Sequence, residues 1–122
     1  MRASASFERV LLHRQPVDGR KQINGLANIV ETTMRENPVG STLYIFISKR
    51  KDVLKALYWD KSGFALWMKR LENEKFRWPI KLEDDVISLS ARQLTWLLDG
   101  LDIAALKAHK SLTFEPNIGD TF

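Results

Sequence analysis

Basic and aromatic side chains gather between residues 48 and 79, in the sequence SKRKDVLKALYWDKSGFALWMKRLENEKFRWP, which holds three of the chain's four tryptophans. Lys and Arg at this density can contact phosphate groups and release counterions, which gives affinity for nucleic acid without reading its sequence. Exposed aromatic rings can stack on unpaired bases. The stretch contains neither Cys nor His. The chemistry that it suggests is therefore binding, not catalysis.

The other candidates for catalysis or metal binding are weak. Glu83, Asp84 and Asp85 form the densest acidic group, but adjacent residues rarely converge on two metal ions about 3.5–4 Å apart. A solvated loop is the favoured interpretation of this run, and a small metal-dependent nuclease is the least favoured function. His13 and His109 lie far apart in sequence and lack the short spacing of a metal-binding pair. We therefore expect no enzymatic activity, no metal and no cofactor.

The whole-chain composition limits the class of protein. The chain has 122 residues, a formal net charge of +4 and no cysteine. This length suits one small domain, and the charge favours a polyanionic partner. The absence of thiols fits a reducing cytoplasm. No apolar run approaches the roughly 20 residues that span a bilayer, so we expect a cytoplasmic protein without membrane contact.

Gly, Pro and Asn residues, which tend to end helices and strands, divide the chain into secondary-structure elements. We expect a loose lead-in over residues 1–8, one α+β domain over residues 9–110 and an irregular tail over residues 111–122. RVLLH at 9–13 predicts a strand. A helix is predicted from Lys21, capped by Asp18 and ended by Asn37-Pro38. Its apolar stripe comprises Ile23, Leu26, Ala27, Val30 and Met34.

A second helix is predicted over residues 91–98. Ser90 and Gln93 have the spacing of a capping box, and Asp99-Gly100 closes the helix. Residues 103–109 predict a further short helical turn. Gly25 stands inside the first apolar stripe and costs about 1 kcal/mol relative to Ala in a helix, so either a close backbone neighbour explains it or the helix is less certain there.

The middle of the chain has the pattern of a β-meander. Four short runs rich in aromatic and β-branched residues, at 43–48, 53–59, 64–71 and 76–78, are separated by KRKD, DKSG and ENEK. These connections have the length and composition of hairpin loops. The predicted fold class is α+β, with an antiparallel meander of about four short strands packed against two or three helices.

A register follows if DKSG forms the loop of its hairpin. Trp59 then lies opposite Phe64, and the pairs Leu57–Leu66, Lys55–Met68 and Val53–Arg70 follow. One face would collect Ile45, Ile47, Leu57, Trp59, Phe64, Leu66 and Met68. The other would collect Tyr44, Phe46, Tyr58, Ala65, Trp67 and Lys69. Both faces are too apolar to lie bare, so helices or a partner should cover at least part of each.

The same register gathers basic residues at one end of the sheet, with Arg77 opposite Arg70. The candidate phosphate-binding residues are Lys49, Arg50, Lys51, Lys55, Arg70 and Arg77. Protection of exposed sheet edges by charge explains the same pattern equally well. Four aromatic residues could form a base-stacking or partner-binding face, although side chains of this kind more often belong to a core: Tyr44, Phe46, Tyr58 and Trp67.

The chain closely resembles the TnpB accessory proteins, which are encoded by the second reading frame of the insertion sequence sixty-six family of bacterial transposable elements. The resemblance covers residues 10–101 and rests on motifs in a fixed order: Arg20-Lys21, Gly25-Leu26-Ala27, Lys49-Arg50-Lys51-Asp52, Leu57-Tyr58-Trp59-Asp60, Gly63, Lys69-Arg70-Leu71-Glu72 and Phe76-Arg77-Trp78-Pro79. This sequence departs from the family pattern at Ile23-Asn24, Ser48 and Glu74.

The resemblance implies an accessory factor of transposition, a form of DNA recombination, that acts beside a larger transposase carrying the catalytic acids. The leading hypothesis is a non-catalytic accessory protein that binds DNA through the basic end of the meander. The alternative is an adaptor that docks on the transposase without contacting DNA. DNA and the transposase of the same element are the expected partners.

Overall fold

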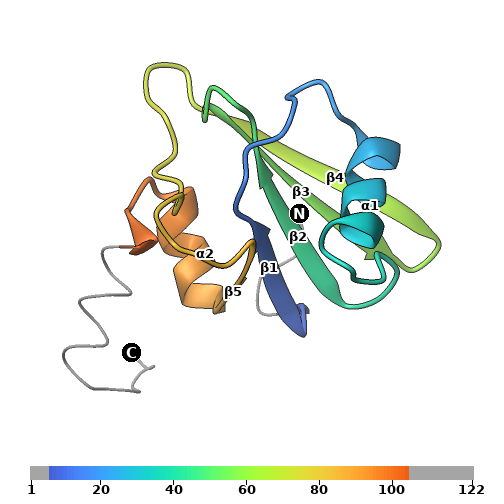
Figure 1. Ribbon diagram of the computed structural model, residues 1–122. Coiled ribbons are helices and arrows are strands. Elements are labelled where there is room, and N and C mark those ends of the chain that lie inside the picture. Colours follow the sequence, from blue (N-terminus) through green and yellow to red (C-terminus); the bar gives the residue numbers. More distant parts are fainter. Residues whose placement is uncertain (1–5, 105–122) are drawn as a thin grey trace.

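Five strands and two helices form within residues 6–104, the part of the chain that the computed structural model describes (Figure 1). In chain order they are β1 (Arg9–His13), α1 (Ile23–Thr32), β2 (Thr42–Ile47), β3 (Val53–Asp60), β4 (Gly63–Arg70), β5 (Val86–Leu89) and α2 (Ala91–Leu98). The predicted α+β class is confirmed. Of the helical turn expected at 103–109, residues 103 and 104 are helical. The rest of that turn, the expected tail and residues 1–5 lie outside the described residues.

The strands make one sheet in the order β4-β3-β2-β1-β5. The predicted meander supplies β2, β3 and β4, which pair antiparallel. β1 joins β2 in parallel, with α1 as the connection between them, and β5 pairs antiparallel with β1. The strand predicted at 76–78 is wrong, because these residues lie in a loop. Phe76 and Trp78 alternate with an exposed arginine because both rings insert into the core.

The predicted register of the β3–β4 hairpin is confirmed in every pair. Trp59 lies opposite Phe64, and the pairing continues to Val53 opposite Arg70. Asp60 and Gly63 also pair, so the loop between the strands contains only Lys61 and Ser62. Lys61 makes this tight turn with a φ of 58°.

The predicted faces of β2 are wrong by one residue. Tyr44 lies opposite Leu57, and Phe46 lies opposite Lys55. Tyr44 and Phe46 therefore share the face of Leu57, while Ile45 and Ile47 share the face of Tyr58 and Trp67. A strand has a period of two, so a shift of one residue exchanges the faces of all its side chains. Every residue of β2 is buried, so its sequence has no polar alternation to mark either face.

Each face of the sheet has its own core, as the apolar area of the meander predicted. α1 covers the first face, where Leu26 and Val30 pack with Leu11, Tyr44 and Phe46. α2 and the loop after β4 cover the second face. The side chains packed there include Leu12, Leu43, Ile45, Leu54, Phe76, Trp78, Leu94 and Leu97. Phe7, which the sequence placed in a loose lead-in, is buried in this second core against the ring of Tyr58.

The helix ends agree with prediction for α2 and differ for α1. Ser90 and Gln93 form the predicted capping box. α1 begins at Ile23 after Gln22, which makes no side-chain cap. Asp18 is not its N-cap, because its carboxylate accepts hydrogen bonds from the backbone and side chain of Arg20. No helix within residues 6–104 is long and apolar enough to cross a membrane.

Replacing Gly25 with Ala should stabilise the fold. A Cβ at this position would meet only the side chain of Lys21, at 3.4 Å, which is an ordinary contact. Gly25→Ala should therefore raise the free energy of unfolding by about 0.5–1 kcal/mol, as for a helical glycine without a steric role. Urea denaturation measures the change. Gly100→Ala is the matched control. It should destabilise, because Gly100 has a φ of 88° that L-residues rarely adopt.

Candidate nucleic-acid interface

The candidate interface centres on residues 49–52 of the loop between β2 and β3, here called the basic tip. The amide of Ser48 donates to the carbonyl of Val53 at 2.9 Å, and the amide of Lys51 donates to the carbonyl of Ser48 at 2.9 Å. The hydroxyl of Ser48 donates to Asp52 and accepts from the amide of Val53, each at 3.1 Å. These bonds fix the turn, and Lys49 and Arg50 extend from it into solvent.

A second segment supports the tip from one side. In the loop after β4, the amides of Leu71 and Phe76 donate to the carbonyls of Asp52 and Lys51, at 2.9 and 2.8 Å. The ammonium of Lys75 donates to the carbonyl of Arg50 at 2.6 Å. Lys75 therefore adds a cation to the basic tip that the sequence analysis did not include. The signal available in the sequence was its position next to the aromatic Phe76, inside the basic and aromatic stretch.

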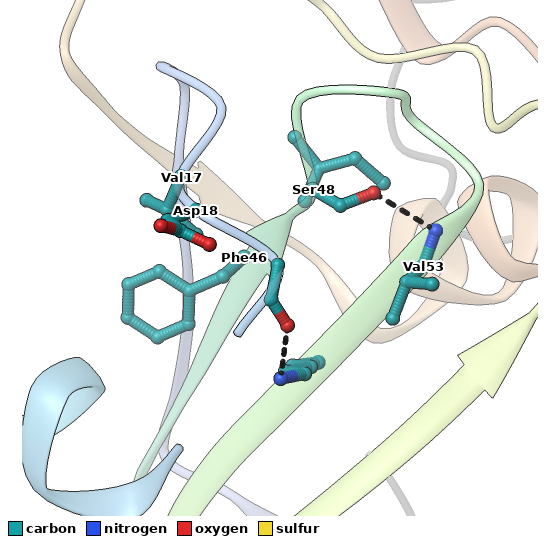
Figure 2. A pocket seen from close by; sticks show the side chains of 8 residues that line it. Val17, Asp18, Phe46, Ser48 and Val53 are labelled. Carbon is teal, nitrogen blue, oxygen red and sulfur yellow. Dashed lines mark hydrogen bonds between the residues drawn. The ribbon is translucent and has the colours of Figure 1, made fainter. Parts of the chain in front are cut away.

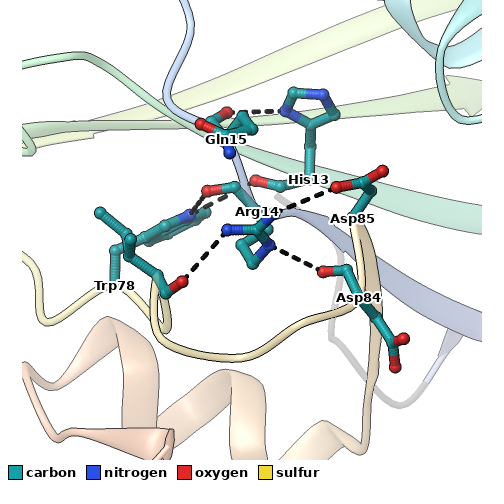
Figure 3. Close-up of polar contacts among 7 residues, drawn as sticks. His13, Arg14, Gln15, Trp78, Asp84 and Asp85 are labelled. Carbon is teal, nitrogen blue, oxygen red and sulfur yellow. Dashed lines mark hydrogen bonds and ion pairs between the residues drawn. The ribbon is translucent and has the colours of Figure 1, made fainter.

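Trp78 fastens this loop to the end of β1 (Figure 3). Its indole N–H donates to the carbonyl of Arg14 at 2.9 Å and, at 3.3 Å, to that of His13. The guanidinium of Arg14 in turn donates to the carbonyls of Ile80 and Asp84. The sequence around Phe76 and Trp78 thus positions the basic tip by anchoring the loop that supports it.

The acidic run has a structural role at the same place. The carboxylate of Asp85 pairs with Arg14 at 3.1 Å, and the amide of Arg14 donates to the carbonyl of Asp85 at 2.9 Å. The ring of the neighbouring His13 is buried and its Nδ1 lies 2.8 Å from the carbonyl of Gln15. Burial lowers the pKa of His13. No group of three or more potential metal ligands lies together within residues 6–104.

A third segment, residues 17–20, closes the other side of the tip. Val17 bridges to Ser48, and its amide donates to the carbonyl of Ile47 at 2.8 Å. Asp18 and Arg20 form an ion pair at 2.8 Å. The hydrogen bonds from Arg20 hold the pKa of Asp18 well below its usual range, and the charge of Lys49 lowers it further. Asp18 therefore stays ionised beside the basic tip.

Lys55 holds this third segment from inside the sheet. Its side chain is 4% exposed, and its ammonium donates to the carbonyls of Gly19 at 2.8 Å and Lys21 at 2.6 Å. It borders a small pocket with Val17, Phe46 and Val53 (Figure 2). Burial lowers the pKa of Lys55, and the carboxylate of Asp18 opposes that shift. Lys55 is therefore removed from the surface on which the sequence placed it.

The structure brings some predicted basic residues together and separates others. Lys49, Arg50 and Arg70 line one open hollow with Asp18, Ser48 and Asp52. Arg70 is paired with Glu72 at 3.1 Å. Lys51 is half-buried at the tip, and its carbonyl accepts from Phe76. Arg77 is exposed, but it follows Phe76 in a loop and has no position opposite Arg70 in the sheet.

The four predicted aromatic residues do not form one surface. Tyr44 and Phe46 have no exposed area and lie on the α1 face, where the hydroxyl of Tyr44 donates to the carbonyl of Asn37 at 2.9 Å. Tyr58 is buried on the opposite face. Trp67 is half-buried on that same face. Of the four rings, Trp67 alone presents substantial surface to a ligand.

Comparisons with known proteins give the chain its relatives. The model of the family described as IS66 Orf2 like protein matches residues 8–108. Two proteins of Sinorhizobium fredii (strain NBRC 101917 / NGR234), each named as uncharacterised, are similar over most of their length. Protein y4jC is 35% identical over 99 residues, which cover 81% of this chain and 84% of y4jC. Protein y4hO is 32% identical over 102 residues, which cover 84% and 88%. No solved structure matches significantly.

The anchoring role of Trp78 can be tested by removing its N–H and keeping an aromatic ring. Trp78→Phe should lower the free energy of unfolding by roughly 1–3 kcal/mol, because the carbonyls of His13 and Arg14 lose a donor and the smaller ring leaves part of the buried site unfilled. Urea denaturation checks this value. The control is Trp59→Phe, since the indole of Trp59 makes an edge contact with Phe64 and its N–H forms no hydrogen bond within residues 6–104. Equal losses in the two variants would contradict the anchoring role.

Proposed function

The chain belongs to the IS66 Orf2-like family of transposition accessory proteins, and from this premise we propose that it is a non-catalytic accessory protein that binds DNA through the basic tip. The proposed contact residues are Lys49 and Arg50, assisted by Lys75 and Lys51. Lys55 is excluded by its burial. Arg77 remains a candidate contact residue at the edge of the tip, because the amide of its neighbour Phe76 donates to the carbonyl of Lys51.

The observation that carries the proposal is the state of the charges at the tip. Lys49, Arg50 and Lys51 take part in no ion pair among residues 6–104. Two nearby acids are paired with other cations, Asp18 with Arg20 and Glu72 with Arg70, and Asp52 accepts a hydrogen bond from the hydroxyl of Ser48. Lys49 and Arg50 are therefore free to contact phosphates, and each contact releases counterions from DNA.

The geometry supports phosphate contact more than base reading. The tip is a short turn, whereas base reading in the major groove typically uses a helix or a two-stranded ribbon that places several polar side chains against base edges. Affinity from the tip alone should therefore be independent of sequence and strongly dependent on salt. This suits an accessory role in which a transposase supplies target recognition and catalysis.

A second candidate is an adaptor that docks on the transposase and does not contact DNA. Its specific support is the half-buried Trp67, since partly exposed tryptophans are enriched at protein interfaces. The burial of Tyr44, Phe46 and Tyr58 leaves it less aromatic surface than the sequence suggested.

Charge removal at the tip tests DNA binding. The double variant Lys49→Gln/Arg50→Gln should bind duplex DNA more weakly, and the slope of log affinity against log salt should fall by about 0.9 for each phosphate that the variant no longer neutralises. Fluorescence anisotropy at several salt concentrations measures both quantities. The control is Arg35→Gln/Lys61→Gln, which removes the same charge. Arg35 precedes Glu36, which pairs with the start of β1, and Lys61 lies in the β3–β4 turn, so both lie at the other end of the sheet.

Equal weakening in the two double variants would show that net charge is responsible and that the tip is not a site. Absence of DNA binding by the unaltered protein, together with retention by immobilised transposase, would favour the adaptor. Circular dichroism establishes that each variant is folded before affinity is compared.

A further inference from the structure

β4 is an unusually open edge of the sheet. It is the outermost strand on its side and has eight residues, whereas β5 at the opposite edge has four. No described strand pairs with its outer side. Edge strands are normally protected by shortness, proline, a bulge or charged side chains. β4 is long and has no proline, its two charged residues, Lys69 and Arg70, stand at one end, and the other six residues carry no charge, with Met68 59% exposed.

The hydrogen-bond pattern identifies which backbone groups of β4 point outward. The amide of Leu71 donates to the carbonyl of Asp52, which continues the register of Val53 opposite Arg70. Bonded and non-bonded pairs alternate along an antiparallel ladder. The residues of β4 that bond to β3 are therefore 63, 65, 67 and 69. The N–H and C=O groups of Phe64, Leu66, Met68 and Arg70 point away from the sheet.

We propose that a second copy of this chain pairs antiparallel with β4, with the two-fold axis at Trp67. In this register Leu66 lies opposite Met68 of the second copy, and Phe64 lies opposite Arg70. All four outward-facing residues of each copy then exchange backbone hydrogen bonds. Centring the axis on Leu66 places Arg70 opposite Ser62 in the turn, and centring it on Met68 places Phe64 opposite Glu72, beyond the strand. Among the in-phase registers, only the one centred on Trp67 uses the whole edge.

The side chains are self-complementary in this register. On the α1 face, Leu66 meets Met68 twice, and the ring of Phe64 meets the cation of Arg70, which is a favourable combination. On the α2 face, the two copies of Trp67 face each other as a non-hydrogen-bonded pair, in which side chains approach closely. Lys69 lies opposite Ala65. No two like charges are opposed, although the strand carries two adjacent cations.

The start of α1 offers room for the second copy. Leu66 lines a hollow with Gln22, Ile23, Asn24 and Gly25. Gly25 has no side chain to occupy this hollow. No close backbone neighbour requires a glycine at this position. Met68 of the second copy would lie opposite Leu66, beside the hollow. An unbranched methionine suits an irregular space of this kind.

Sedimentation equilibrium of the full chain tests the proposal, with Met68→Pro and Met68→Val as matched variants. Proline removes an outward N–H without removing a bond to β3, whereas valine keeps the N–H and an apolar side chain. The unaltered chain and Met68→Val should dimerise. Met68→Pro should raise the dimer dissociation constant by about tenfold or more, because each copy loses a bond across the axis. Circular dichroism and thermal unfolding verify that the proline variant is folded.

Cysteine cross-linking tests the register independently, because the chain contains no cysteine. Trp67→Cys places two thiols across the axis, where Cα atoms about 4.5 Å apart permit a disulfide. In Ala65→Cys the two thiols are offset by four residues along the paired strands, about 13 Å, and should not cross-link. Trp67→Cys should therefore form a covalent dimer on oxidation much faster than Ala65→Cys.

Three results would overturn the proposal: a monomer at every concentration tested, equal dimerisation of folded Met68→Pro and Met68→Val, or equal cross-linking of the two cysteine variants. If Met68→Pro fails to fold, the cross-linking comparison decides. Neither measurement involves DNA, so the outcome is independent of the proposed role of the basic tip.

Discussion

The anchoring of the loop after β4 is the constraint on which the rest of this structure depends. This loop has no regular secondary structure over residues 71–85, and yet it covers part of one face of the sheet. A covering loop must find partners for its backbone and fill the core with its side chains. Phe76 and Trp78 supply the filling, and the bonds of Trp78 and Arg14 supply the partners. The same loop then delivers β5 to the edge of β1 and supports the basic tip.

The tip is rigid because two segments distant in sequence converge on it. The loop after β4 bonds to one side of the tip, and residues 17–20 lie along the other, near the same end of the sheet (Figure 1). Lys55 fixes the second segment by donating to two of its carbonyls. Because hydrogen bonds already fix the backbone of the turn, contact with a phosphate has to order only the side chains of Lys49 and Arg50. Lys55 therefore contributes to the site through its position in the core, although it contacts nothing outside the protein.

The parts of the fold that sequence could predict are those set by local signals. The β3–β4 register follows from a short turn between two long runs, and the α2 cap follows from residues three apart. The faces of β2 could not be predicted, because all six residues of that strand are buried and alternation disappears. The segment around Phe76 and Trp78 has the alternating pattern of a strand, because a loop can also bury every second side chain. Lys55 reads as a surface cation, since its burial depends on carbonyls 34 and 36 residues away. The sequence predicts Asp18 as a helix N-cap, but in the structure its carboxylate accepts hydrogen bonds from Arg20 instead.

The placement of the candidate interfaces follows from how the sheet is covered. α1 occupies one face, and α2 with the anchored loop occupies the other, so neither face is available to a partner over its full area. Interaction is thereby restricted to the ends of the strands and the edges of the sheet. The end at the basic tip is rich in unpaired cations, which suits a polyanion. The edge at β4 is apolar with outward-facing backbone groups, which suits another strand. The two surfaces differ in chemistry and meet at Arg70, which lines the hollow at the tip and is also the last residue of β4.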